Sequence, residues 1–129
     1  MMPQEPLTID DVLGAKSGQR ILRLTGPIII SNLFDLQARM RANKTQTLIL
    51  DFTQVPYIDS AGIGALVGAY VTHQKDGRKL FLAGVSERIH NALIVTHVEQ
   101  FFTFFPTLAD AEAATGKSVI ADRTPPLSS

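Results

Sequence analysis

The chain has 129 residues, of which 45% are hydrophobic and 19% are charged. This length and composition are typical of one globular domain with its own hydrophobic core, and they exclude a disordered chain. Twelve basic residues balance twelve acidic ones and form no basic run, which argues against nucleic acid as the main partner. The absence of cysteine excludes disulfides, thiolate chemistry and cysteine-ligated zinc.

The chain shows no sign of a membrane span or of a secretion signal. No apolar run approaches the roughly 18 residues that a spanning helix needs. The first residues are acidic and lack the basic start and apolar core of a signal peptide. We therefore expect a cytoplasmic protein, with a flexible N-terminus at 1–6, one domain over 7–116 and a C-terminal tail at 117–129.

Two strands and a helix are predicted in the first third of the chain. Residues 7–12 begin with alternating apolar residues, and 20–25 follow a Lys-Ser-Gly-Gln turn signal, so the pair predicts an antiparallel hairpin. A first helix then follows, with Ser31 or Asn32 as its cap. The residues that we expect to form its buried stripe are Leu33, Leu36 and Met40.

The central stretch, residues 48–70, predicts a buried strand followed by a helix. The strand is indicated by the continuous apolar run Leu-Ile-Leu at 48–50, and Asp59-Ser60 opens the helix. The apolar residues at helical spacing, expected to cover the sheet, are Ile63, Leu66, Val67, Tyr70 and Val71.

Three glycines lie inside this predicted helix, at Gly62, Gly64 and Gly68. Each weakens the helix by about 1 kcal/mol relative to alanine. We expect the compensation to be a close approach of the helix backbone to the sheet or to a partner.

The last part of the chain predicts a further strand, two helices and an aromatic segment. Gly77 stands as a C-terminal helix cap before a strand at 80–83, which runs parallel to the central strand through a right-handed crossover. Ser86 caps the next helix, Phe101–Phe105 forms a last extended segment, and a short helix ends at Gly116. The predicted class is α/β, a mixed sheet of about four or five strands with about four helices.

The familiar catalytic patterns do not match this chain. The three glycines lie inside the helix and not in its entry turn, unlike the glycines of a dinucleotide-binding loop. The histidines do not have metal-ligand spacing, and Ser60 is not flanked by the glycines of a nucleophile elbow. We therefore expect no enzymatic activity, no metal and no cofactor.

Asp59 and Ser60 stay open to two interpretations. Both residue types are favoured helix caps, so one of them is expected to cap the helix. Alternatively, Ser60 is a phosphorylation switch, because a phosphate at a helix N-terminus meets unsatisfied amide groups and the positive end of the dipole. The same charge on an apolar docking surface would repel a partner.

The motif Asp-Ser-Ala-Gly-Ile-Gly at 59–64, with its Leu-Ile-Leu-Asp strand and Val-Pro-Tyr-Ile lead-in, resembles the STAS family. That family comprises bacterial anti-sigma factor antagonists and the cytoplasmic domains of sulfate transporters. The resemblance runs from about Arg20 to Ala114 and so covers most of the chain.

The resemblance implies a non-enzymatic switch. An anti-sigma factor that is also a serine kinase binds the unphosphorylated antagonist, phosphorylates the serine after the motif aspartate, here Ser60, and a phosphatase restores it. The resemblance places partner binding at the helix start and in the loop after the second strand. The residues so implied are Asp59, Ser60, Ala61, Gly62 and Gly64, with Gly26, Pro27 and Ile29 in the loop.

The loop after the second strand departs from the antagonist pattern. Pro27 and Ile29 stand where antagonists usually carry acidic residues, which makes this loop more similar to the transporter-type domains. The alternative function is therefore a STAS scaffold or ligand-binding module of a transporter or signalling complex, with Ser60 only a helix cap. A homodimer through Phe101–Phe105 is a further possibility, although aromatic residues of this kind are more often core.

Overall fold

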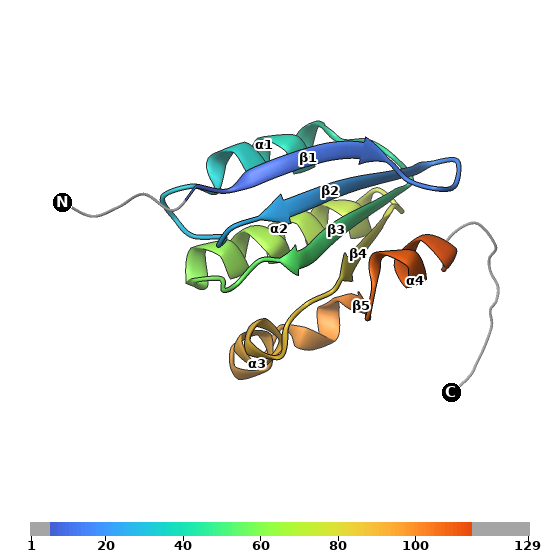
Figure 1. The fold of residues 1–129 in the computed structure, drawn as a ribbon. Helices are drawn as coiled ribbons and strands as arrows, with labels where there is room; N and C mark the ends of the chain where they lie inside the picture. Colours follow the sequence, from blue (N-terminus) through green and yellow to red (C-terminus); the bar gives the residue numbers. More distant parts are fainter. Residues whose placement is uncertain (1–5, 115–129) are drawn as a thin grey trace.

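The computed structural model describes residues 6–114, which form a mixed five-stranded sheet with helices on both faces (Figure 1). The strands, in their order across the sheet, are β1 (Thr8–Leu13), β2 (Gln19–Thr25), β3 (Thr47–Gln54), β4 (Lys79–Ala83) and β5 (Thr103–Phe105). The helices are α1 (Phe34–Ala42), α2 (Ser60–Lys75), α3 (Glu87–Val95) and α4 (Leu108–Ala113), with a 3-10 turn at Glu99–Phe101. The predicted α/β class is confirmed.

Three of the sequence-based expectations cannot be compared with this structure. The flexible N-terminus at 1–6 (except for Pro6), the helix end at Gly116 and the tail at 117–129 lie outside the described residues.

The sheet topology places two loops side by side at one edge. β1 and β2 form the predicted antiparallel hairpin, and β2, β3, β4 and β5 run parallel to one another. The connection from β3 through α2 to β4 is the predicted parallel crossover. Because β2 and β3 are parallel neighbours, the loop from β2 to α1 and the loop from β3 to α2 leave the same edge of the sheet.

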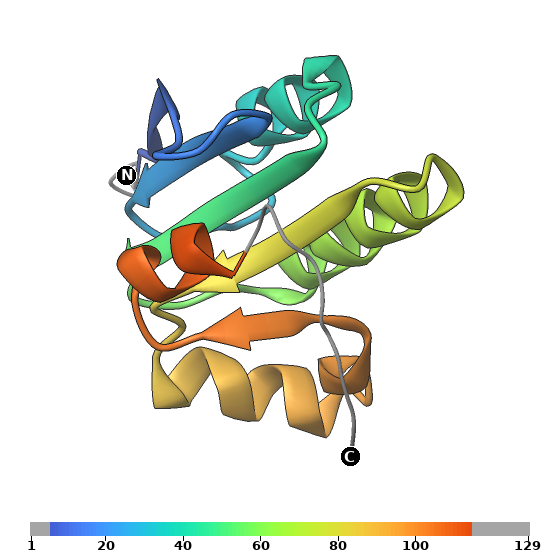
Figure 2. The same cartoon turned by 90° about the vertical axis from the view of Figure 1, so that its right-hand side faces the viewer.

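The main core lies between the sheet and α1, α2 and α3, and a smaller one lies under α4. Figure 2 shows α1 and α2 on one side of the sheet and α4 on the other. Alternate residues of β3 serve the two sides: Leu48 and Leu50 belong to the main core and Ile49 to the smaller one. The helical residues buried with them are Leu36 and Met40 from α1, Ile63, Ala65, Leu66 and Ala69 from α2, Ile89 and Leu93 from α3, and Ala111 from α4.

The prediction for the start of α1 was wrong. The N-cap is Leu33, which makes no side-chain cap hydrogen bond. Asn32 folds back on its own loop instead: its Nδ2 donates to the Pro27 carbonyl at 2.9 Å and its Oδ1 accepts from the Ile29 amide at 3.1 Å. The predicted buried stripe of Leu33, Leu36 and Met40 is confirmed.

The buried face of α2 differs from the predicted one. Val71 is 47% exposed, and small residues take part in the buried face with His73. The physical reason is that alanine and glycine let the helix backbone lie close to its neighbours. Which residues of α2 are buried therefore depends on how closely the helix packs and not on the size of its apolar side chains. The buried residues of α2 are Gly62, Ile63, Ala65, Leu66, Ala69 and His73.

Helices α2 and α3 are each followed by a residue in the left-handed backbone conformation. Gly77 has φ of 70° and ends α2 as predicted, with the Arg78 amide donating to the His73 carbonyl at 2.9 Å. At the end of α3 the left-handed residue is His97, with φ of 63°. In the predicted aromatic segment Phe102 is buried, whereas Phe101 is 39% exposed and stacks on Tyr70.

Candidate functional site

The predicted motif lies where the loop before α1 meets the loop before α2. A parallel bridge pairs Ile28 with Ile58, and the Asp59 amide donates to the Ile28 carbonyl at 3.1 Å. The Ile28 amide in turn donates to the Tyr57 carbonyl at 3.2 Å. These bonds extend the pairing of β2 and β3 beyond the strands, so the two loops form one surface.

Asp59 joins the two loops through both of its carboxylate oxygens. Oδ1 accepts a hydrogen bond from the Gly62 amide at 2.9 Å, which makes Asp59 the N-cap of α2. Oδ2 accepts from the Ile30 amide at 3.0 Å, across in the loop before α1. One side chain therefore caps the helix and holds the neighbouring loop against it.

Gly62 is the position where the two loops approach most closely. A Cβ at this residue would lie 2.6 Å from the Ile28 carbonyl oxygen and 2.6 Å from the Ile58 side chain, distances that real Cβ atoms do not show. A Cβ at Gly64 or Gly68 would meet nothing within 4 Å. The expected close approach is therefore confirmed inside the chain at Gly62 alone.

Ser60 is the first residue of α2, and it is exposed. The expectation that one of the two residues caps the helix is confirmed at Asp59, so Ser60 is not the N-cap that the alternative function assumed. Its hydroxyl stands at the positive end of a helix of 16 residues, directly beside the residue that holds the two loops together.

Two exposed apolar residues lie near this site, one on the loop that Asp59 holds and one at the first position of α1, and sequence reasoning missed both as surface candidates. Ile30 is 64% exposed and Phe34 is 77% exposed. Phe34 falls outside the buried stripe of Leu33, Leu36 and Met40, and this position in the sequence could have predicted its exposure. Exposed large apolar side chains beside a functional motif are typical of a protein-binding surface.

The predicted loop residues differ in their access to solvent. Pro27 is buried, and Gly26 has φ of 113° and packs against the Pro6 carbonyl, so both serve the conformation of the loop. Ile29 is half-buried. On α2, Gly62 is buried whereas Ala61 is half-buried and Gly64 is exposed.

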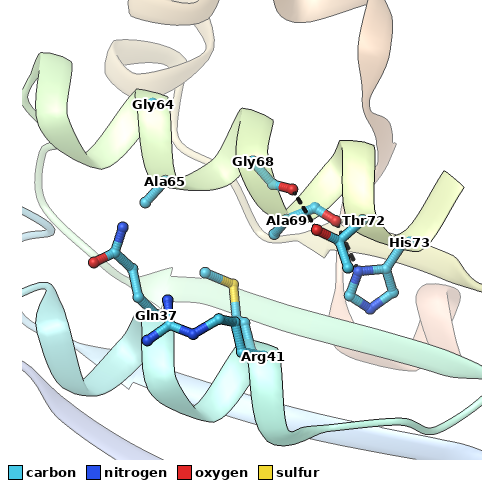
Figure 3. Close-up of a pocket in the computed structure, with 9 residues that line it drawn as sticks. Gln37, Arg41, Gly64, Ala65, Gly68, Ala69, Thr72 and His73 are labelled. Carbon is cyan, nitrogen blue, oxygen red and sulfur yellow. Dashed lines mark hydrogen bonds between the residues drawn. The ribbon is translucent and has the colours of Figure 1, made fainter. Parts of the chain in front are cut away.

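A groove of about 210 Å³ lies between α1 and α2 (Figure 3). Figure 3 shows Gln37 pointing from α1 toward α2, whereas the Arg41 side chain lies along α1 toward Gln37. On the α2 side, the Thr72 hydroxyl donates a hydrogen bond to the Gly68 carbonyl at 3.1 Å. The residues that line the groove are Gln37, Met40 and Arg41 from α1, with Gly64, Ala65, Gly68, Ala69, Thr72 and His73 from α2.

His73 lies at the far end of α2, buried to 2% exposure. Its Nδ1 lies 2.8 Å from the Ala69 carbonyl, which only accepts, so Nδ1 carries the proton and Nε2 faces Arg78 Nη1 at 3.5 Å. Burial lowers the pKa of His73 below its ordinary value, more than the hydrogen bond to Ala69 raises it. A neutral histidine in this setting is a structural residue.

The described part of the chain holds no candidate metal centre. Within residues 6–114, no group of three or more histidine, cysteine, aspartate or glutamate side chains is arranged to hold a metal ion. None of the helices in the same range is long and apolar enough to cross a membrane.

The architecture is that of a small α/β domain that presents a capped helix start and an adjoining loop at one edge of a mixed sheet. The family model described as "STAS domain" matches residues 10–111. The chain therefore belongs to the STAS domain family, as its motif predicted.

Individual relatives fall into two kinds. An anti-sigma-B factor antagonist of Staphylococcus epidermidis is 30% identical over 92 residues, covering 71% of this chain and 82% of the relative. The crystal structure of a sulfate transporter family protein from Wolinella succinogenes is similar with a TM-score of 0.64 and 26% identity, over 76% of this chain and 84% of that one. An anti-sigma factor antagonist from Mycobacterium paratuberculosis shares the fold, with a TM-score of 0.69 and 20% identity over 83% and 93% of the two chains.

Proposed function

We propose that the chain is a non-enzymatic, cytoplasmic regulatory protein of the anti-sigma factor antagonist kind, switched by phosphorylation of Ser60. The observation that supports this proposal most is the division of labour at the start of α2. Asp59 caps the helix and holds the loop, and Ser60 next to it is exposed. A phosphate can therefore be added at Ser60 without removing the cap.

The unmodified surface suits a protein partner. Ile30 and Phe34 supply exposed apolar area on the loop side, and Gly64 leaves the backbone of α2 open to contact. The name of the Staphylococcus relative implies an anti-sigma factor as partner. The resemblance to the STAS family implies that this factor is a serine kinase and that a phosphatase reverses the reaction. Such a partner would bury Ile30 and Phe34 when it docks on Ser60.

A phosphate at Ser60 would add about −1.5 to −2 charges to this surface. The amide groups of the first turn of α2 and its dipole tolerate that charge. A partner that covers Ile30 and Phe34 would have to bury the phosphate or approach it across an apolar contact, which costs binding free energy. Phosphorylation would therefore release the partner without unfolding the domain.

The experiment is affinity isolation of the tagged chain from its own cells. Wild type and Ser60→Ala are expected to retain a protein kinase of the anti-sigma class, and Ser60→Asp is expected to lose it. Phe34→Ser should also lose it, whereas Val95→Ser on α3 serves as control, because Val95 is 74% exposed and Phe34 is 77% exposed. Equal recovery of the kinase with wild type and Ser60→Asp would overturn the proposal.

The sequence of the loop before α1 supports a second candidate function. Pro27 and Ile29 replace the usual acidic residues, and the Wolinella relative is described as a sulfate transporter family protein. The alternative is a STAS module in a transporter or signalling complex that does not depend on Ser60. In the same isolation, a partner retained equally by wild type, Ser60→Ala and Ser60→Asp would favour this module.

A further inference from the structure

Basic residues that are far apart in the sequence gather at the end of the domain opposite Ser60. The parallel strands β2, β3 and β4 start at this end and α1 and α2 finish there, at the right of Figure 1. We call this surface the basic end, defined by half of the twelve lysines and arginines of the chain: Arg39, Arg41, Lys44, Lys75, Arg78 and Lys79.

Hydrogen bonds between the elements hold the basic end together. Arg78 Nη1 donates to the Asn43 carbonyl at 2.8 Å, which ties the start of β4 to the end of α1. The Lys79 amide donates to the Gln46 carbonyl at 2.9 Å. Lys44 and Arg39 line a shallow cavity of about 280 Å³ that also reaches the ion pair of Arg20 with Asp11. The charges therefore form one surface and not a scatter of separate side chains.

Two of these six cations form ion pairs, and the Asp76 carboxylate also lies within electrostatic range of Lys44 and Lys75. Arg78 pairs with Asp76 at 2.8 Å, and Arg39 lies 3.3 Å from Asp35 within α1. Among the described residues, none of the four remaining cations is in an ion pair; they are Arg41, Lys44, Lys75 and Lys79.

Helix dipoles explain only part of this arrangement. Cations in the last turn of a helix are favourable, and that accounts for Arg39, Arg41 and Lys75. Lys44 lies beyond the end of α1 and Lys79 begins a strand, so the helix ends give no reason for either. The charge exceeds what the fold itself requires.

Exposed apolar residues of the hairpin lie at the same end. Leu13, the last residue of β1, is 74% exposed and pairs in register with Arg20 at the start of β2, and Val12 before it is 38% exposed. A cluster of Lys and Arg flanked by an exposed leucine fits a surface that is anionic outside and apolar beneath. A nucleic acid backbone would give Leu13 nothing to contact.

We propose that the basic end docks on an anionic lipid bilayer, with the cations on the headgroup phosphates and Leu13 reaching below them. In this orientation the start of α2, at the opposite end of the domain, faces away from the bilayer (Figure 1). Ser60, Ile30 and Phe34 then stay accessible to a protein partner while the domain is bound.

The test is sedimentation of the full chain with vesicles of phosphatidylcholine, alone or mixed with phosphatidylglycerol. We expect binding to the mixed vesicles only, weakening as salt rises to about 0.15 M. Each Lys or Arg near such a surface is worth about fivefold in partition, so Lys44→Gln with Lys75→Gln should lower it at least about tenfold. The matched control is Arg23→Gln with Arg88→Gln, which removes the same charge outside the basic end.

Three results would overturn the proposal. The first is equal binding to neutral and anionic vesicles, and the second is an equal loss in the double variant and its control, with circular dichroism confirming that both are folded. The third concerns nucleic acid: if duplex DNA binds more tightly than the mixed vesicles and Leu13→Asn leaves vesicle partition unchanged, the basic end is a phosphate-backbone surface. A selective loss of vesicle binding in Leu13→Asn supports the bilayer.

Discussion

At the residue scale the site depends on the two oxygens of Asp59. One oxygen accepts from Gly62 within α2, and the other accepts from Ile30 in the loop before α1. A helix cap alone needs only the first of these bonds. The second makes Asp59 a positioning residue, because it fixes the loop that carries Ile30 and leads into Phe34 of α1 relative to Ser60.

Substitutions of Asp59 separate these two roles. Asp59→Asn keeps an oxygen for the cap but places an amide group opposite the Ile30 amide, so the free energy of unfolding should fall by about 1 kcal/mol. Asp59→Ala loses both bonds and should lower it by roughly 1–3 kcal/mol. Urea unfolding followed by circular dichroism measures both values. If Asp59→Ala were as stable as wild type, the described role of Asp59 would be wrong.

His73 predicts a pH dependence of stability. Its pKa is lowered in the folded protein, chiefly by burial, so the unfolded chain binds a proton more readily. Stability should therefore fall as pH drops below about 6.5, the ordinary histidine value, and level off once the pH is below the folded pKa. Thermal unfolding from pH 8 to pH 5, at about one-unit steps, should show a shallower fall in His73→Gln than in wild type. An unchanged slope in His73→Gln would contradict this cause.

At the element scale α2 uses its glycines in two different ways. Gly62 lets the helix start approach Ile28 and Ile58, where a Cβ has no room. Gly64 and Gly68 face the groove toward α1, where a Cβ would meet nothing. The fold therefore requires the first glycine and only tolerates the other two.

The effect of a glycine-to-alanine substitution on stability should differ in sign between two positions of this helix. Gly62→Ala forces the two loops apart and should destabilise the domain by roughly 1–3 kcal/mol. Gly64→Ala should stabilise it by up to about 1 kcal/mol, because alanine favours helix and meets no neighbour here. Chemical denaturation of the two variants beside wild type gives the comparison. Equal destabilisation by both would show that Gly64 also serves internal packing.

The sequence predicted elements well where one local signal decides the structure. The apolar run at 48–50 gave β3, Ser86 gave the cap of α3, and Gly77 gave the end of α2, each confirmed by the structure. It failed where contacts between segments decide. Asn32 is a favoured N-cap residue, but its side chain forms hydrogen bonds with the Pro27 carbonyl and the Ile29 amide and so does not cap α1.

The site was only partly predictable for the same reason. The motif placed Asp59 and Ser60 at a helix start, and the structure assigned the cap to Asp59. The bond from Ile30 to Asp59 joins residues 29 positions apart, so no local pattern indicates it. The exposure of Phe34, in contrast, could have been predicted, because Phe34 falls outside the stripe of Leu33, Leu36 and Met40.

At the scale of the whole molecule, the two ends of the domain differ in character. Ser60, Ile30 and Phe34 lie at the end of the domain where the parallel strands finish. The basic end lies where these strands start. The sequence shows no basic run, because its cations are brought together only when α1, α2 and β4 meet. A partner at one end and an anionic surface at the other do not compete for the same face.

The central claim is that Ser60 is modified in the living cell, and intact-mass analysis of the protein isolated from its own cells tests it most directly. We expect a species heavier by one phosphate in the wild type that is absent from Ser60→Ala and whose abundance differs between growth and stress. If growth, starvation and stress all yield the unmodified mass alone, the switch is contradicted, and the surface around Ser60 is that of a constitutive STAS scaffold.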